Sequence, residues 1–305
     1  MERSLVIVSD ADLYYFPAFA GDRVFITQLF SGRPGRLFNA LRKLCPPLAR
    51  FRYGPWKNQL DGYDRIVVMD VAALMDASLF SFLRSGSASA DIFIYSWNMD
   101  LSDGQIKILK EKAERYSCGL YSYDEGFCAR HGFTFNTIMF DAGLRCPPVP
   151  LECDAVYLGL SKDRLDVVER AARVLTQAGL QLDFTVVGPG AADGMEPYIK
   201  QSINYVPYQE YLLRIYRSRA IVDIAQHGQL GYSMRVMESI FYDKKLITTN
   251  PHVVDAPFFK YGNVLVLDER TSLIEVKEFM ARPTAPYGDE IRRYYSVEAW
   301  ADRFI

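Results

Sequence analysis

The sequence has few of the residues that build disulfide frameworks or metal centres. It contains only five cysteines and three histidines among 305 residues, and no two cysteines form a CxxC pair. The cysteines are Cys45, Cys118, Cys128, Cys146 and Cys153. An odd, unpatterned set of cysteines is typical of reduced cytoplasmic thiols and argues against a disulfide-stabilised secreted protein or a zinc site. With so few histidines, we also expect no His-rich metal centre.

Long apolar runs and a strong charge imbalance are missing as well. No run approaches the ~18 apolar residues of a membrane-spanning helix. The first ten residues, MERSLVIVSD, lack the basic and long apolar regions of a signal peptide. We therefore expect a cytoplasmic protein, for which peripheral contact with the inner face of a membrane stays open. The formal net charge of -2 argues against a broad surface for nucleic acid.

The first half of the chain alternates short apolar runs with helical patterns. Strands are expected over residues 4–9, 63–70, 90–98 and 119–124, and helices over 34–44, 72–85, 101–116 and 125–132. Ser102 or Asp103 is suited to cap the third helix, and Gly132 to end the fourth. This alternation predicts an α/β domain with a parallel sheet and helices on both faces.

A proline-rich segment then interrupts the alternation, which starts again after it. Three prolines within residues 146–152 (CPPVPLE) exclude a central strand or a helix interior. Further strands are expected over residues 154–160, 182–188, 220–226, 245–250 and 263–268, and helices over 162–179, 208–218, 233–243, 272–282 and 294–305. We predict two Rossmann-like βαβ domains, 1–150 and 151–305, facing each other across a cleft that binds the ligand. Trp300 and Phe304 are expected to anchor the last helix back on the first domain.

The stretch GYSMRVMESIFYDKKLITTN, residues 231–250, has the features of an anion site. A loop containing Gly231 leads to Ser233, a suitable helix cap, and the amides of residues 233–236 would then point at a phosphate. Arg235 lies in the first turn, where the helix dipole disfavours a cation without an anionic partner. Glu238 lies one turn on and is suited to accept two ribose hydroxyls. The alternative is an Arg–Glu pair on a solvated helix face.

A second basic cluster follows the first strand of the second half. The strand ends at Gly159, and Ser161, Lys162 and Arg164 lie at the turn into the next helix. Cations beside a helix N-terminus are suited to hold a diphosphate. An ordinary surface turn has the same composition, so the prediction rests on the shared position of both clusters at carboxyl ends of strands.

A glycine-rich segment, VVGPGAADG at residues 186–194, matches part of a dinucleotide-binding fingerprint. That fingerprint requires a helix directly after it, and the following residues contain prolines and no apolar period. We therefore do not assign a phosphate loop there. Tyr205, further along, is expected either to border a nucleobase or to pack against the sheet.

Polar residues that follow strands in the first half are candidates for the acceptor side. Asp10 and Asp12 form a D-x-D motif, for which a base that takes a proton from an acceptor hydroxyl is a better interpretation than a metal site. Trp97, Asn98 and Asp124 are suited to hold a sugar by stacking and hydrogen bonds. Each of these residues has a purely structural alternative.

The second half resembles bacterial glycosyltransferases with two Rossmann-like domains, the GT-B type. The similarity covers residues 153 to 305 and is carried by GLSKDR, by Arg235 to Ser239, and by KKLITTN. It is greatest to the group 1 enzymes of lipopolysaccharide, O-antigen and capsule synthesis. The resemblance implies that Glu238 binds the nucleotide ribose and that Lys162 and Arg164 bind phosphate.

The resemblance has one departure. Many group 1 enzymes have a glutamate eight residues before the helix glutamate, and here Leu230 occupies that position. His227 and Gln229 are then the candidates for contacts to the donor sugar, with His227 also a candidate catalytic residue beside Asp10 and Asp12.

The combined expectation is a transferase that moves a sugar from a nucleotide-sugar donor to a saccharide or lipid-linked saccharide, in cell-surface polysaccharide synthesis. It would need no metal and no cofactor, because the nucleotide sugar is a substrate. Two alternatives stay open: another nucleotide-sugar enzyme, such as an epimerase, and a non-catalytic scaffold with the same fold.

Overall fold

The computed structural model describes residues 2–9, 23–32, 34–141, 143, 146, 148–160, 164–188, 198–204 and 206–305. The chain divides into two compact units. The first contains Met1–Asp141 together with Val297–Ile305, and the second contains Ala142–Ser296. The sequence analysis placed the division a few residues later, after residue 150, within the proline-rich segment 146–152.

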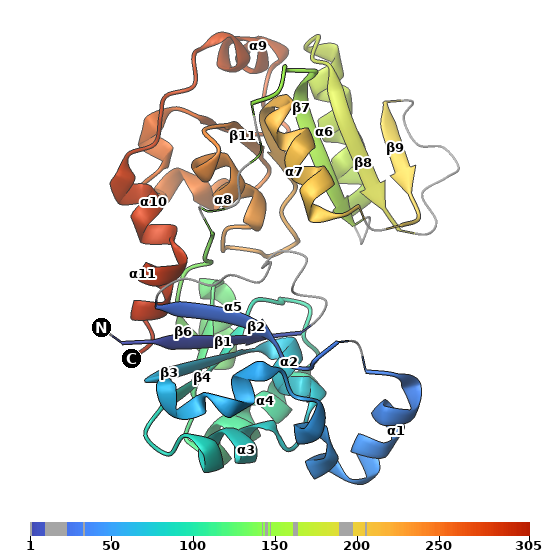
Figure 1. Ribbon diagram of the computed structural model, residues 1–305. Coiled ribbons are helices and arrows are strands. Elements are labelled where there is room, and N and C mark those ends of the chain that lie inside the picture. The colour runs from blue at the N-terminus through green and yellow to red at the C-terminus, as the bar shows by residue number, and fades with distance from the viewer. Residues whose placement is uncertain are drawn as a thin grey trace. The chain divides into compact units, whose positions relative to one another are not determined.

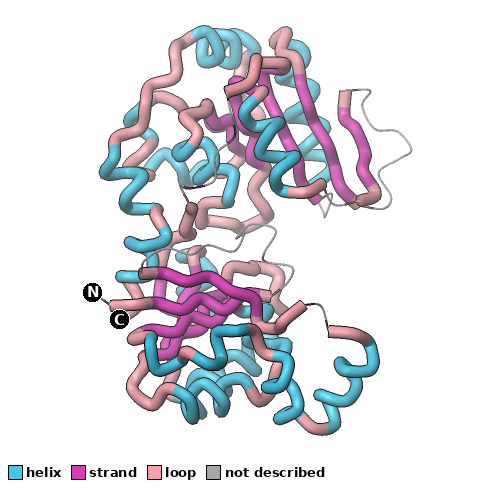
Figure 2. Tube along the Cα trace, viewed as in Figure 1, coloured by secondary structure: helices cyan, strands magenta, loops and turns pink. Residues whose placement is uncertain are grey.

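The first unit is built on one parallel sheet (Figure 2). Its described strands are β1 (Ser4–Val8), β2 (Val24–Gln28), β3 (Arg65–Met69), β4 (Asp91–Ser96), β5 (Gly119–Ser122) and β6 (Thr134–Phe135). They lie in the order β2-β1-β3-β4-β5-β6. The edge strand β2 and the two-residue β6 were not predicted, because neither has the continuous apolar run that identified the central strands.

Helices cover both faces of this sheet. The unit contains α1 (Arg36–Leu44), α2 (Asp70–Met75), α3 (Leu79–Gly86), α4 (Asp103–Tyr116), α5 (Glu125–His131) and α11 (Val297–Asp302). Ile92 and Ile94 of β4 share a core with α2, α3 and α4, which lie along one face in Figure 1. The alternate residues, Phe93 and Tyr95, face the other way, because side chains along a strand alternate between faces.

The end of the chain packs on that second face. The Trp300 ring lies 5.1 Å from the Tyr95 ring, and the Phe304 ring lies 5.2 Å from Phe93 and 4.8 Å from Tyr121. The Tyr121 hydroxyl also donates a 2.7 Å hydrogen bond to the carbonyl of Ile305. The last residues of the chain therefore complete the core of the first unit.

The second unit also has one parallel sheet. Its described strands are β7 (Cys153–Leu160), β8 (Leu182–Val187), β9 (Ile199–Ser202), β10 (Ser218–Asp223), β11 (Lys245–Thr248) and β12 (Val264–Val266). They lie in the order β9-β8-β7-β10-β11-β12. Counted within the unit this order is 3-2-1-4-5-6, the arrangement of dinucleotide-binding domains, whose ligands lie where the order reverses. The reversal point here is between β7 and β10.

The helices of the second unit again lie on both faces (Figure 1). They are α6 (Leu165–Gln177), α7 (Tyr208–Tyr216), α8 (Met234–Phe241), α9 (Leu273–Ala281) and α10 (Asp289–Tyr295). Helices α6 and α9 share one core with inward residues of β7, β8 and β10. Helix α8 is buried along almost its whole length, as its apolar sequence predicts.

Two predicted helices are each divided in the structure. The helix expected over 72–85 is broken between α2 and α3, where Asp76 accepts hydrogen bonds from both the backbone and the hydroxyl of Ser78. A short side chain that bonds its own backbone competes with the helix in this way. The helix expected over 294–305 is broken at Ser296, whose extended backbone separates α10 from α11.

In the described ranges, no helix combines the length and the apolar character needed to cross a membrane.

Candidate functional site

The reversal point of the second sheet carries a compact set of polar side chains. Strand β10 ends at Asp223, which is 1% exposed although it has a carboxylate. One of its oxygens accepts a 2.7 Å hydrogen bond from Ser233, and the other a 2.9 Å bond from Thr248 at the end of β11. Asp223 thus connects the ends of two neighbouring strands with the start of α8.

Arg235 extends from α8 to the carboxyl ends of the neighbouring strands β7 and β10. Its guanidinium donates to the carbonyl of Leu158, lies 3.7 Å from Asp223, and lies 5.2 Å from the centre of the Tyr157 ring. A fully solvated Arg–Glu pair, the alternative left open by the sequence, is not what the structure shows. The cation instead lies at the position where a Rossmann-like sheet binds its ligand.

Gly159 makes this position of Arg235 sterically accessible. A Cβ atom added at Gly159 would lie 2.9 Å from Nη2 of Arg235 and 2.5 Å from the Tyr157 hydroxyl. Both distances are shorter than van der Waals contact, so a larger residue would displace the guanidinium. Gly159 was expected to contact the donor, and its observed role is to leave space for the arginine.

Arg164 reaches the same edge of the sheet from the turn before α6. Its Nη1 donates a 2.5 Å hydrogen bond to the carbonyl of Ile224, the residue that follows Asp223. The structure therefore brings Arg164 and Arg235, which are 71 positions apart in the sequence, to the end of one strand. This convergence was predicted from the positions of both clusters after strands.

The amides at the start of α8 are less free than the sequence suggested. The amide of Arg235 donates to the Ser233 hydroxyl at 3.1 Å, and the amide of Val236 donates to the Ser233 carbonyl at 3.1 Å. Ser233 is the helix cap, as predicted. These two bonds occupy amides that were predicted to bind phosphate. The binding of an anion here would therefore depend more on the arginine side chains than on the amides at the helix N-terminus.

Glu238 is placed differently from the exposed carboxylate expected to bind ribose. It is 1% exposed, and its Oε1 accepts a 2.9 Å hydrogen bond from Tyr208 at the start of α7. Burial raises the pKa of Glu238 to about 7, although the charge of Arg235 and the hydroxyls of Tyr208 and Tyr211 act in the opposite direction. Through Oε1, Glu238 therefore joins α7 to α8, and its binding of a ribose stays a prediction.

The loop before α8 is held by its own polar groups. The side chain of Gln229 accepts from the amide of Gln226 at 3.1 Å and donates to the carbonyl of Gly231 at 2.9 Å. Gln229 is buried, and its amide braces the loop, while its predicted contact with a sugar stays a prediction. His227 is exposed at the tip of the same loop, beside Gly228 with its φ of 72°.

Five predicted site residues lie outside the described residues. They are Asp10, Asp12, Ser161, Lys162 and Tyr205. Most of the glycine-rich segment 186–194 lies outside them as well. Within the described residues, no group of three His, Cys, Asp or Glu side chains is arranged to hold a metal ion.

The first unit has its own polar cluster, at the carboxyl ends of β3 and β4. Asp70 is fully buried and accepts hydrogen bonds from the hydroxyl of Ser96 and from the amide of Asn98, both at 3.0 Å. The side chain of Asn98 also donates to Asp70 at 3.0 Å, and Trp97 next to it is half-buried. Asn98, predicted to hold an acceptor, is thus oriented by a buried carboxylate.

Asp124 has a structural role. It is fully buried, and it caps α5 by accepting a 2.6 Å hydrogen bond from the amide of Phe127. The structure thus shows Asp124 as a buried helix cap, and its contact with an acceptor sugar stays a prediction.

Sequence analysis missed Asp70 and Asp223 as organising residues of their sites. Each is an aspartate directly at the end of an apolar strand, in VVMD and AIVD. That position was the available signal, because carboxyl ends of parallel strands line the ligand edge.

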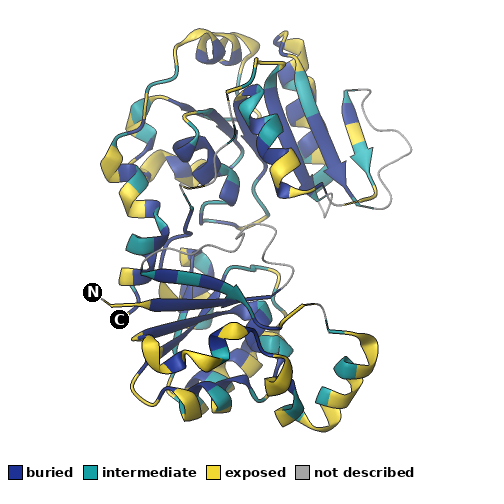
Figure 3. Cartoon of the chain, viewed as in Figure 1, coloured by how far each residue is buried: buried dark blue, intermediate teal, exposed yellow. Residues whose placement is uncertain are grey.

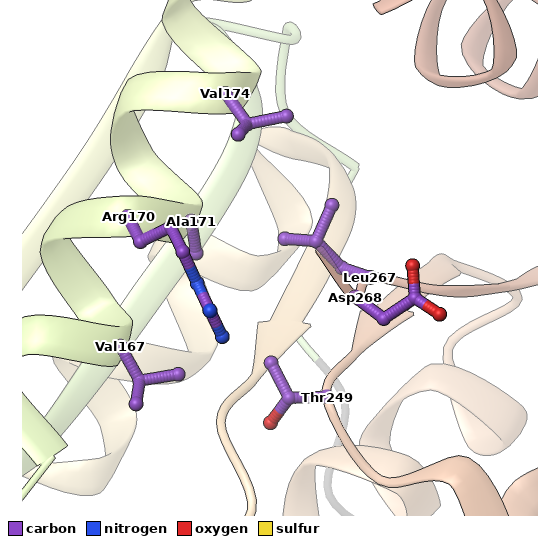
Figure 4. A pocket seen from close by; sticks show the side chains of 7 residues that line it. All are labelled: Val167, Arg170, Ala171, Val174, Thr249, Leu267 and Asp268. Carbon is purple, nitrogen blue, oxygen red and sulfur yellow. The ribbon is translucent and has the colours of Figure 1, made fainter. Parts of the chain in front are cut away.

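A small pocket lies elsewhere on the second unit, between α6 and the segments after β11 and β12 (Figure 4). Its lining consists of Val167, Arg170, Ala171, Val174, Thr249, Leu267 and Asp268. None of the described residues predicted to bind the donor is among them, so the pocket does not identify the donor site.

No family model matches the sequence, and no curated protein matches it. Solved structures do resemble it. AviGT4, described as a glycosyltransferase involved in avilamycin A biosynthesis, has a TM-score of 0.57 at 12% identity, covering 100% of this chain and 96% of that one. A UDP-forming α,α-trehalose-phosphate synthase from Burkholderia vietnamiensis has a TM-score of 0.45 at 12% identity, with the same coverage. The first likeness shows that the chain has two Rossmann-like units of the GT-B type.

Proposed function

We propose that this protein is a glycosyltransferase that uses a nucleotide-sugar donor. The observation that carries the proposal is the convergence of Arg164 and Arg235 at the reversal point of the second sheet. In sheets with this strand order, nucleotides lie beyond the carboxyl ends of the strands at that point. Arginine is well suited to hold a diphosphate, because its planar guanidinium binds phosphate oxygens through paired hydrogen bonds.

The chemistry at such a site separates charge. The bond between the sugar carbon and the diphosphate oxygen breaks, the acceptor hydroxyl oxygen forms the new bond, and its proton passes to a base. Cations fixed beside the departing diphosphate stabilise the negative charge that develops on it. Asp10, Asp12 and His227 are the proposed candidates for the base. The first unit would bind the acceptor through the surface beside Trp97 and Asn98.

We propose further that the leaving group needs no divalent metal. Arg164 and Arg235 approach one strand end, and Lys162 is two positions before Arg164 in the sequence. Fixed positive groups of this kind can replace a metal ion at a diphosphate. Activity should therefore persist in excess chelator. Activity lost with chelator and restored by magnesium or manganese would instead make Asp10 and Asp12 the leading metal site.

The resemblance of the second half to lipopolysaccharide, O-antigen and capsule enzymes supports a role in cell-surface polysaccharide synthesis. Acceptors in such pathways are saccharides or lipid-linked saccharides. We place the protein accordingly in the cytoplasm, in contact with the inner face of the membrane.

A panel of nucleotides and nucleotide sugars tests the proposal. Binding would be measured by calorimetry, and the products of each mixture would be analysed by chromatography. Release of free sugar or its transfer to an added acceptor is the expected result. An epimerised donor without transfer would show that the enzyme belongs to another class. The absence of binding across the panel would support the non-catalytic alternative, for which the pairing of Arg235 with Asp223 is a specific argument.

A further inference from the structure

Helix α1 presents its apolar side to solvent. Leu37, Leu41 and Leu44 are spaced as i, i+4 and i+7, so they share one face of the helix. They are 76%, 44% and 85% exposed. No residue of α1 is buried, and Figure 3 shows the helix in yellow and teal only. An amphipathic helix on a globular protein normally turns this face to the core, so the orientation of α1 needs another explanation.

The opposite side of α1 attaches the helix to its unit. Phe38 lies 6.0 Å from the Phe30 ring, and Arg42 donates to the carbonyl of Met75. Asn39 bonds back to the carbonyl of Pro34 at 3.2 Å. The outward position of the leucines is therefore fixed by these contacts on the other side of the helix.

A further exposed apolar side chain follows α1 in the sequence. Phe51, in the 3-10 helix Pro46–Arg52, is 69% exposed and has the Arg50 guanidinium 5.6 Å from its ring centre. We call Leu37, Leu41, Leu44 and Phe51, with the exposed cations that accompany them, the α1 surface. Those exposed cations are Arg36, Lys43 and Arg50.

The stretch of sequence that carries the α1 surface has charges of one sign only. From Val24 to Leu60 the sequence contains no aspartate or glutamate, whereas it contains seven cations. The cations are Arg33, Arg36, Arg42, Lys43, Arg50, Arg52 and Lys57. The formal net charge of the whole chain is -2, so this concentration is local. An apolar face bordered by lysine and arginine matches the chemistry of an anionic phospholipid surface, with a fatty interior beneath negative headgroups.

We propose that the α1 surface binds the anionic face of a phospholipid bilayer. Leu37, Leu44 and Phe51 would enter the region between headgroups and acyl chains, while Arg36 and Lys43 contact the headgroups. The inference rests on the proposed membrane location but not on the proposed sugar transfer. It gives the first unit a means of meeting an acceptor that is itself anchored in lipid.

Vesicle sedimentation with the full chain, in the absence of any nucleotide, tests this surface separately from catalysis. The protein should sediment with vesicles of phosphatidylcholine and phosphatidylglycerol, and much less with phosphatidylcholine alone. Added salt should weaken the binding, because the headgroup contacts are screened. Each cation near an anionic surface contributes about fivefold in affinity, so the double variant Arg36→Glu and Lys43→Glu should bind at least about tenfold more weakly.

A second variant tests the apolar part, and α9 supplies the matched control. Leu37→Ser with Leu44→Ser should also release the protein from anionic vesicles. In α9, Ile274 is 67% exposed and Lys277 is exposed on the same helix, so Ile274→Ser with Lys277→Glu removes comparable groups from another surface. That control should bind as the unchanged chain does.

Three results would overturn the proposal. The first is equal sedimentation with neutral and anionic vesicles, or none with either. The second is equal loss of binding in the α9 control. The third is a dimer, seen by light scattering, that dissociates when Leu37 and Leu44 become serine, which would show that a second copy of the chain covers the surface.

Discussion

At the scale of single residues, the candidate site is defined by groups that are buried against expectation. Asp223 and Glu238 are both 1% exposed. Asp223 lies 3.7 Å from the guanidinium of Arg235, and the charges of Arg235 and Asp223 both act on the pKa of Glu238. Removing a carboxylate from water favours its neutral form. The sequence predicted that Glu238 and Arg235, one turn apart, act together on the donor. It did not show that the hydroxyl of Tyr208, thirty positions earlier, would donate a hydrogen bond to the carboxylate of Glu238.

The raised pKa of Glu238 makes stability depend on pH. Because its folded pKa of about 7 exceeds the ordinary value of 4.5 for a glutamate, the stabilising contribution of its proton is complete below pH ~4.5 and is lost as the pH rises through 7. Glu238→Gln keeps a neutral acceptor for Tyr208. In urea unfolding, the free energy of unfolding of the variant should rise relative to that of the unchanged chain by up to about 3 kcal/mol as the pH is raised from 4.5 to 7. Parallel curves would mean that Arg235 keeps Glu238 ionised throughout.

The close approach at Gly159 gives a second test at this scale. In Gly159→Ala, the new methyl would meet Tyr157 at 2.5 Å and Arg235 at 2.9 Å. Overpacking of this kind costs about 1–3 kcal/mol, and nucleotide binding should weaken because Arg235 moves. Gly104→Ala in α4 is the control, since the nearest atom to its added Cβ is 4.0 Å away. Equal unfolding free energies for both variants would show that the space at Gly159 is not restricted.

At the scale of elements, paired lysines in the segment KKLITTN hold helix ends. Lys244 donates to the carbonyls of Tyr216 and Ser218 at the end of α7, and Lys245 donates to three carbonyls at the end of α9. The last carbonyls of a helix have no partner within it, and cations there also favour the helix dipole. This role was not evident from the sequence, because it depends on helices that begin or end 28 to 37 positions away.

Lys245→Met should therefore destabilise α9 selectively. The substitution keeps most of the apolar stem and removes the ammonium, which leaves the carbonyls of Phe279, Met280 and Arg282 without their donor. The loss should be about 1–3 kcal/mol in unfolding free energy, with faster amide hydrogen exchange in α9. Lys277→Met on the exposed side of the same helix is the control. If both variants have the same stability, the carbonyls at the end of α9 are satisfied in another way.

At the scale of the whole molecule, the sequence predicted the two-unit α/β architecture because its apolar runs and helical patterns alternate twice. It also predicted which clusters would meet, since Arg164 and Arg235 both follow strands of one parallel sheet. What could not be predicted was the state of each side chain. The contact of Glu238 with Tyr208 joins segments thirty positions apart, and no local pattern records it. Asp124 and Gln229 bond to groups two or three positions away, but their burial depends on how the whole unit packs around them.

The last residues of the chain stabilise the first unit. Trp300 is fully buried, its ring lies 4.7 Å from Phe304, and its carbonyl accepts a 3.1 Å hydrogen bond from Asn136. Trp300→Ala should cost about 3–5 kcal/mol, measured by guanidinium unfolding. Ile305→Ala, at a side chain that is 96% exposed, should leave stability unchanged. A Trp300 variant as stable as the Ile305 variant would show that the terminal segment is dispensable.

The central claim is that the second unit binds a nucleoside diphosphate at the reversal point of its sheet. Calorimetric titration of nucleoside diphosphates into the unchanged chain, Arg164→Ala, Arg235→Ala and Arg217→Ala tests this most directly. Arg217 directly precedes β10 and pairs with Glu152, so it lies at the amino end of the strand whose carboxyl end carries Asp223. A charge-assisted hydrogen bond contributes about 1.5–3 kcal/mol, so the Arg164 and Arg235 variants should bind at least about tenfold more weakly, while the Arg217 variant binds normally. Binding that is unaffected in the first two variants, or that is absent from the unchanged chain for every nucleotide, would contradict the account.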